Sequence, residues 1–97
     1  MQTYVVLRRS GWRTAQDLRN SNARLHEEAE RMPDDVAWIR SYVLEEHDRT
    51  IGTVCIFQAA GPEAIRRHAA AAELPIDEII KVADTVIVRE DVVSAES

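Results

Sequence analysis

Residues 36–58 read VAWIRSYVLEEHDRTIGTVCIFQ, and this stretch decides the fold. Residues 36–45 and 50–58 are both rich in β-branched and aromatic side chains, which favour strands. The residues between them, 46–49, are all polar and few enough to form a hairpin loop. The stretch therefore predicts two antiparallel strands in direct succession.

Two further elements are predicted on the N-terminal side of this hairpin. Residues 3–8 read TYVVLR, which indicates a strand. From Ala15 to Met32 one stripe of residues, all apolar except Asn22, recurs at spacings of three and four, which is typical of an amphipathic surface helix. The hydroxyl of Thr14 can cap the start of this helix, and Pro33 follows its end.

The C-terminal side of the hairpin predicts one helix and one more β-rich stretch. Gly61 and Pro62 suit a helix start, because proline lacks an N–H where none is needed. Residues 78–89 are rich in Ile and Val but are interrupted by Ala83 and Asp84, so they predict one bent strand or two short ones.

The predicted order β-α-β-β-α-β is that of the split βαβ unit. It implies an α+β, ferredoxin-like fold in which a four-stranded antiparallel sheet carries both helices on one face. We expect a single domain over residues 1–91 and a flexible tail over residues 92–97.

Composition narrows the class of protein. The chain has 97 residues, enough for one domain, and 17 acidic against 12 basic side chains give a net charge of -5, the wrong sign for a general nucleic-acid binder. No apolar run approaches the roughly 20 residues that span a bilayer. A single cysteine, Cys55, leaves no internal disulfide and fits a reducing compartment. We expect a cytoplasmic protein with neither nucleic acid nor membrane as a partner.

The side chains of the strand over residues 36–45 predict an interface. Regular alternation places Trp38, Arg40 and Tyr42 on one face, and Ile39 and Val43 on the other. Because helices cover only one face, an apolar face remains exposed, and we expect a homodimer with its sheets face to face. The Trp38, Arg40 and Tyr42 face can instead stack a planar ligand against the guanidinium; aromatic and arginine enrichment at interface cores favours the dimer.

The sequence contains none of the standard linear signatures of catalysis, such as a glycine-rich phosphate loop or an HExxH motif. His68, in the second predicted helix, is a candidate metal ligand or proton carrier, or else a surface histidine beside the core. Cys55 is a candidate second ligand, or a small buried hydrophobe. His26, one turn before Glu30, and His47, in the acidic loop, are more typical of solvated surface.

Four segments occur in the order of a known family: WIRSYV at 38–43, VCIFQA at 54–59, PEAIRRHA at 62–69 and LPIDEI at 74–79. On these segments the chain resembles the small nickel-binding proteins of actinobacteria, from Thr3 to about Val82. The resemblance implies a dimeric ferredoxin-like fold.

The same resemblance implies a set of metal ligands. Family members typically pair a histidine in the W-x-x-S-Y strand with the cysteine of the next strand and the histidine of the second helix. Those positions are Arg40, Cys55 and His68 in this chain. Arg40 departs from the pattern, because a guanidinium stays protonated and does not ligate metals.

Three hypotheses follow. The leading one is a cytoplasmic, non-enzymatic homodimer that binds nickel or another divalent transition metal through His68 and Cys55. The alternative is a small-ligand-binding or cofactor-free enzyme domain of the dimeric α/β barrel type, in which the Trp38, Arg40 and Tyr42 face binds the ligand and Arg40 holds its anionic group. The third is an interaction module whose sheet face or edge strand recruits a partner.

Overall fold

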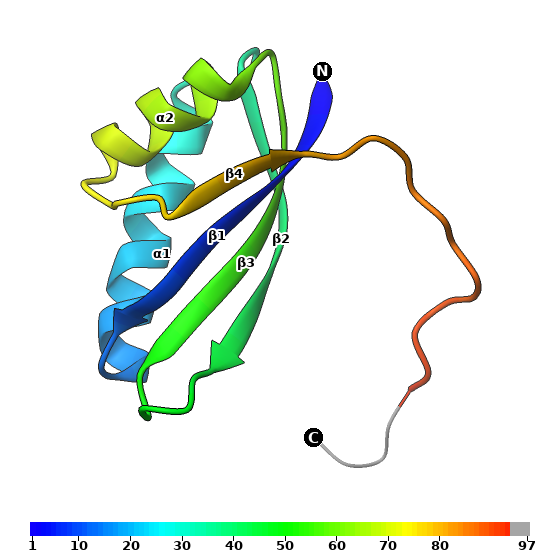
Figure 1. Cartoon of the computed structure of the whole chain (residues 1–97). Coiled ribbons are helices and arrows are strands. Elements are labelled where there is room, and N and C mark those ends of the chain that lie inside the picture. Colours follow the sequence, from blue (N-terminus) through cyan, green and yellow to red (C-terminus); the bar gives the residue numbers. More distant parts are fainter. Residues whose placement is uncertain (94–97) are drawn as a thin grey trace.

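The computed structural model describes residues 1–93. Its elements follow the predicted order: β1 (Gln2–Trp12), α1 (Ala15–Glu30), β2 (Val36–Glu45), β3 (Ile51–Ala59), α2 (Pro62–Ala71) and β4 (Glu78–Lys81). The strands form one antiparallel sheet in the order β2-β3-β1-β4. Both helices lie on the same side of this sheet (Figure 1). The predicted ferredoxin-like α+β fold is confirmed.

Local chemistry accounts for the start of each helix. The Thr14 hydroxyl caps α1 by accepting a hydrogen bond from the backbone N–H of Asp17 (3.1 Å). Pro62 occupies the first turn of α2, where its missing N–H leaves no helical hydrogen bond unmade. From these starts, α1 buries Leu18 and Leu25 against the sheet.

The hydrophobic core lies between the sheet and the helices. Val6 of β1 and Phe57 of β3 have no exposed surface, and Ile65 of α2 is 1% exposed. We call this helix-covered side the inner face of the sheet, and the other side the open face. On the open face, Ile39 and Tyr42 of β2 remain 45% and 51% exposed.

A β-bulge at Ile39 changes which side chains of β2 share a face. Trp38 pairs with Phe57, whereas Arg40 pairs with the residue just before Phe57, so Ile39 is the extra residue. Trp38 therefore lies on the inner face, where its ring stacks on Phe57 with 6.1 Å between centroids. Arg40 and Tyr42 lie on the open face. The predicted common face of Trp38, Arg40 and Tyr42 is wrong, because regular alternation allows for no bulge.

The β-rich stretch predicted over residues 78–89 forms a strand only over Glu78–Lys81. β4 runs antiparallel to β1, toward the start of that strand, where the N–H of Val82 still donates to the carbonyl oxygen of Thr3 (2.9 Å). Since β1 begins at Gln2, later residues have no backbone left to pair with. The prediction of one bent strand or two short strands over residues 78–89 is wrong for this reason.

Residues 82–93 follow β4 without regular secondary structure. Of the predicted tail, Val92 and Val93 are exposed, and residues 94–97 lie outside the described residues. Neither helix in the described part of the chain is long and apolar enough to cross a membrane.

Candidate functional site

A group of polar side chains lies between the inner face and the helices. We call it the inner polar cluster; it consists of Arg8, Ser41, Thr53, Cys55 and His68. The strand register builds it, because Arg8 of β1 lies opposite Thr53 of β3, and Ser41 of β2 lies opposite Cys55. Four members are buried, and Ser41 is half-buried. Buried polar groups of this kind require specific hydrogen-bond partners.

His68 is completely buried, at 0% exposure. Its Nε2 lies 2.8 Å from the carbonyl oxygen of Leu25, which only accepts, so Nε2 carries the proton and donates it. Nδ1 is then unprotonated and carries a lone pair, and it has no hydrogen-bond partner among the described residues. The rings of Phe57 and His68 form a T-shaped pair, with 5.4 Å between their centroids. The alternative of a surface histidine is therefore wrong.

The electrostatic surroundings of His68 keep the imidazole neutral. Burial lowers the pKa of His68 below its ordinary value, because the charged form loses its hydration. The Leu25 carbonyl offsets this in part, while the positive charge of Arg8 lowers the pKa further. The neutral ring with an available Nδ1 is the form that can act as a metal ligand.

Cys55 is a free thiol, 1% exposed, in the middle of β3. Its Sγ accepts a hydrogen bond from the Ser41 hydroxyl (3.0 Å), which in turn accepts one from Nε1 of Trp38 (2.8 Å). Nη1 of Arg8 lies 3.9 Å from the same sulfur. The thiol is therefore held in one place by side chains from β1 and β2.

Arg8 is the charged member of the inner polar cluster. It is 3% exposed, and its Nε donates to the carbonyl oxygen of Pro75 (2.8 Å). Burial lowers the pKa of Arg8, and the neighbouring Cys55 raises it in part. None of the ion pairs in the described chain includes Arg8. The cluster therefore has a positive charge next to its thiol.

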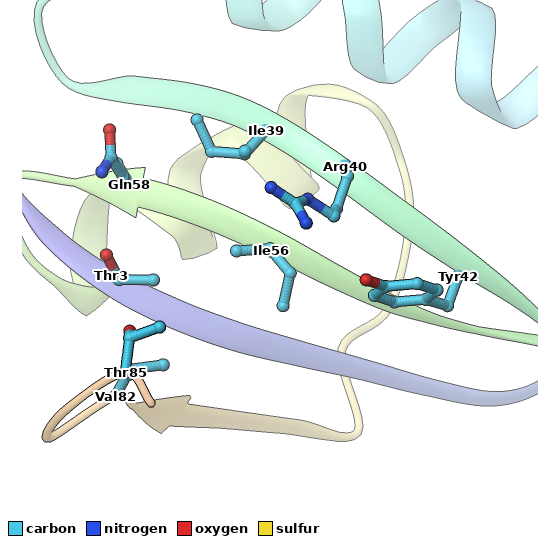
Figure 2. A pocket seen from close by; sticks show the side chains of 8 residues that line it. All are labelled: Thr3, Ile39, Arg40, Tyr42, Ile56, Gln58, Val82 and Thr85. Carbon is cyan, nitrogen blue, oxygen red and sulfur yellow. The ribbon is translucent and has the colours of Figure 1, made fainter. Parts of the chain in front are cut away.

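A second candidate site lies on the open face. It is a pocket of about 340 Å³ lined by Thr3, Ile39, Arg40, Tyr42, Ile56, Gln58, Val82 and Thr85. Figure 2 shows the guanidinium of Arg40 reaching from β2 toward Ile56 of β3, with Tyr42 further along β2. Trp38 does not line this pocket. Arg40 takes part in none of the ion pairs found within residues 1–93.

The remaining histidines lie on the surface, as predicted. Nε2 of His26 pairs with Glu30 one turn later (2.7 Å), and both side chains are 69% exposed. His47 is exposed in the hairpin loop, and its acidic neighbour Glu46 is engaged by Arg9 (3.0 Å). That hydrogen bond from Arg9 lowers the pKa of Glu46.

Sequence reasoning missed three members of the inner polar cluster: Arg8, Ser41 and Thr53. The signal for Arg8 was its spacing. Tyr4 and Val6 are buried, and a period of two places Arg8 next on the same face. A charged residue at an inward position needs a partner, so it indicates a buried polar site. Ser41 gave no comparable signal, because its face depends on the bulge at Ile39.

The family described as "Nickel responsive protein SCO4226-like" matches residues 4–82. The chain belongs to the SCO4226-like family. The resemblance inferred from the four sequence segments is confirmed. No curated protein sequence matches the chain.

A solved member of the SCO4226-like family shares the fold. The crystal structure of SCO4226 from Streptomyces coelicolor A3(2) matches with a TM-score of 0.69 over 87% of this chain and 99% of that chain. The two sequences are 16% identical. At this identity the match supports the fold and carries no residue roles.

The ligand set implied by the family resemblance is not assembled on one face here. Arg40 lies on the open face, whereas Cys55 and His68 belong to the inner polar cluster. Within the described residues, no three His, Cys, Asp or Glu side chains are close enough to hold a metal ion together.

The two inner residues nevertheless fit a transition metal by donor type. Nδ1 of His68 is a buried lone pair without a partner, and Cys55 offers sulfur. Imidazole nitrogen and thiolate sulfur are both accepted by divalent nickel. The donor types of these two residues therefore suit a transition metal.

Proposed function

We propose that this member of the SCO4226-like family is a non-enzymatic homodimer that binds a divalent transition metal, nickel first, with Nδ1 of His68 as the principal donor. One observation carries the proposal: Nε2–H is fixed on the Leu25 carbonyl while the buried Nδ1 has no partner among the described residues. Metal-ligating histidines are commonly oriented in this way, through a carbonyl bonded to the other ring nitrogen.

Cys55 is the proposed second donor. Thiols bind metals as thiolates, so binding releases a proton from Cys55. The resulting negative charge is balanced by Arg8, whose Nη1 is 3.9 Å from Sγ. This compensation matters, because an uncompensated guanidinium would repel a divalent cation. A bound metal would be held by the neutral ring of His68 and the thiolate of Cys55, and would supply a Lewis-acidic centre on the inner face.

The homodimer is proposed from the open face. Tyr42, Ile39 and Ile80 remain between 45% and 51% exposed there, and Val5 and Ile56 between them are only half-buried. The register places these residues side by side across the sheet, since Ile56 pairs with Val5 and Val5 with Ile80. A contiguous apolar sheet face of this kind favours a second copy stacked about 10 Å away. The single unpaired Cys55 supports a cytoplasmic location.

Calorimetric titration of reduced, chelator-treated protein with nickel, and with zinc in parallel, tests the metal proposal. His68→Gln is the decisive variant, because the glutamine amide still donates toward Leu25 while Nδ1 is removed. His26→Gln is the matched control, since it removes an exposed histidine paired with Glu30. We expect saturable binding with proton release in the wild type and in His26→Gln, and loss of binding in His68→Gln. Binding that survives His68→Gln contradicts the proposal, whatever the effect of His26→Gln.

A second candidate function rests on the open-face pocket. Arg40 offers a cationic group beside apolar Ile39 and Ile56, which suits a small acid with an apolar body. We propose Arg40→Gln as its test, with the exposed Arg66→Gln as control, against a panel of small carboxylic acids followed by protein NMR shifts. Shifts in β2 that Arg40→Gln abolishes support the site. Shifts that Arg66→Gln alone abolishes, or no shifts at all, rule it out.

A further inference from the structure

The segment after β4 is an apolar arm. We define the C-terminal arm as residues 83–93. The part of the chain that matches the SCO4226-like family ends at Val82, so the arm lies beyond the matched residues. Its large aliphatic residues are highly exposed to solvent, at 69–95%: Val86, Ile87, Val88, Val92 and Val93. Residues of this kind favour strands and burial, and neither is satisfied within one copy.

The arm leaves the sheet on the open side. In Figure 1 it departs from the end of β4 and extends away from the helices. Its residues 86–91 line a hollow together with Arg40 of the same copy, yet Ile87 is still 81% exposed, so the arm passes beside its own sheet without being buried on it. The space into which it extends is the space that a second sheet, stacked on the open face, occupies.

β2 offers a matching surface. It is an edge strand of the described sheet, because only β3 pairs with it, and it has 10 residues. An edge strand of this length presents a row of unpaired backbone groups to any extended segment. The charges of the two segments are complementary as well, because β2 carries the exposed Arg40 and the arm carries Glu90 and Asp91.

We propose that the C-terminal arm of one copy pairs as an added strand with the free edge of β2 in a second copy, so that one of the adjacent acidic residues Glu90 and Asp91 lies on the same face as the partner's Arg40. The proposal rests on the face-to-face homodimer described above. In that dimer the open face is occupied by the partner sheet, so the arm has no room to cross its own sheet toward its own β2. A two-fold axis along the strands brings β4 of each copy over β2 of the other.

The C-terminal arm is long enough to reach the edge of β2 in the second copy. About ten extended residues span roughly 33 Å, whereas stacked sheets lie about 10 Å apart and four strands are about 15 Å wide. Strand addition supplies backbone hydrogen bonds, and pockets for alternate side chains supply specificity. Burial of Val86, Val88 and their neighbours adds a hydrophobic contribution.

Paramagnetic relaxation in a mixed sample tests the exchange directly. Full-length ¹⁵N-labelled protein is mixed in equal amounts with unlabelled full-length protein that carries a spin label at Val88→Cys in a Cys55→Ser background. Any broadening of ¹⁵N amides is then intermolecular. We expect the amides of residues 38–43 in β2 to broaden most. A label at Arg66→Cys, on the exposed side of α2, is the control and broadens them less.

Sedimentation of the same samples separates the two proposals. Sharp β2 amides in a sample that sediments as a dimer overturn the arm exchange and leave the homodimer standing. A monomer at all concentrations overturns both.

Charge reversal gives a second test. Arg40→Glu, and the double change Glu90→Arg with Asp91→Arg, should each weaken self-association by about tenfold, and their combination should restore it. Glu27→Arg, an exposed change on α1, should leave self-association unaltered. An Arg40→Glu chain that associates as tightly as the wild type contradicts the proposed contact.

Discussion

The two faces of the sheet are built from the same strands and differ in what covers them. The inner face is covered by α1 and α2, and its side chains, among them Phe57 and Cys55, are buried within one copy. The open face bears apolar side chains that remain accessible to solvent in a single copy. Ile56 is partly exposed, and Tyr42 is 51% exposed.

Because of this difference, substitutions on the inner face should change the stability of a single chain, and substitutions on the open face should change the association of two copies. Side chains on the inner face contribute to the folding of a single chain, because their burial is complete before any partner arrives. Side chains on the open face gain most of their burial from a second copy. Neighbouring residues of one strand alternate between the faces, so adjacent substitutions should give different outcomes.

The largest contrast is expected between Phe57→Ala and Ile56→Ala, adjacent in β3. Phe57 is fully buried, and its truncation should lower the free energy of unfolding by about 3–5 kcal/mol, because it removes core contacts and leaves a cavity. Ile56→Ala should cost about 1 kcal/mol or less in the monomer and should weaken self-association instead. Urea unfolding at low protein concentration measures the first effect and sedimentation the second. Equal losses of stability would break the distinction between the faces.

The next effect in size is the pH dependence that His68 gives to the inner face. Its pKa is lowered in the folded chain from the ordinary value of 6.5, so the unfolded chain binds more protons below that pH. Stability should be complete above about pH 6.5 and should decrease below it, with a slope that approaches about 1.4 kcal/mol per pH unit from this group.

Urea unfolding between about pH 5 and 6.5 measures this slope. His68→Gln should flatten the curve, whereas the exposed His26→Gln should retain it. A slope that survives in His68→Gln would have to arise from another group.

The smallest contrast is between Ser41→Ala and Tyr42→Ala, adjacent in β2. Ser41 accepts from Nε1 of Trp38 (2.8 Å) and donates to Sγ of Cys55 (3.0 Å), so its loss should reduce stability by about 1 kcal/mol. Tyr42 is 51% exposed, and its truncation should affect self-association more than unfolding. Thermal unfolding and sedimentation of both variants measure the contrast. A larger stability loss for Tyr42→Ala would place it in the monomer core.

Much of the fold could be predicted because its signals are local. The Thr14 cap and Pro62 fix where helices begin through groups a few residues apart. The hairpin of β2 and β3 is also local, and its polar loop is visible in the sequence. β4 was overestimated, since its length depends on where β1 begins, far away in the chain.

The candidate site was predictable only in part. His68 and Cys55 were found by residue type, but their burial beside Arg8 was not. The site on the open face was predicted with Trp38, and the bulge at Ile39 moves that side chain to the inner face. A bulge depends on pairing with β3, so alternation along β2 alone does not reveal it.

The sequence by itself determined the order of the elements, the helix starts and the family. The elements and helix starts depend on residues close together in the chain, and the family is identified by four short sequence segments. Only the tertiary structure decided which face each residue of β2 occupies, where β4 ends, and that the Nδ1 atom of His68 is buried without a partner in the described chain. These depend on register between distant strands, and a shift of one residue in register turns every side chain to the other face.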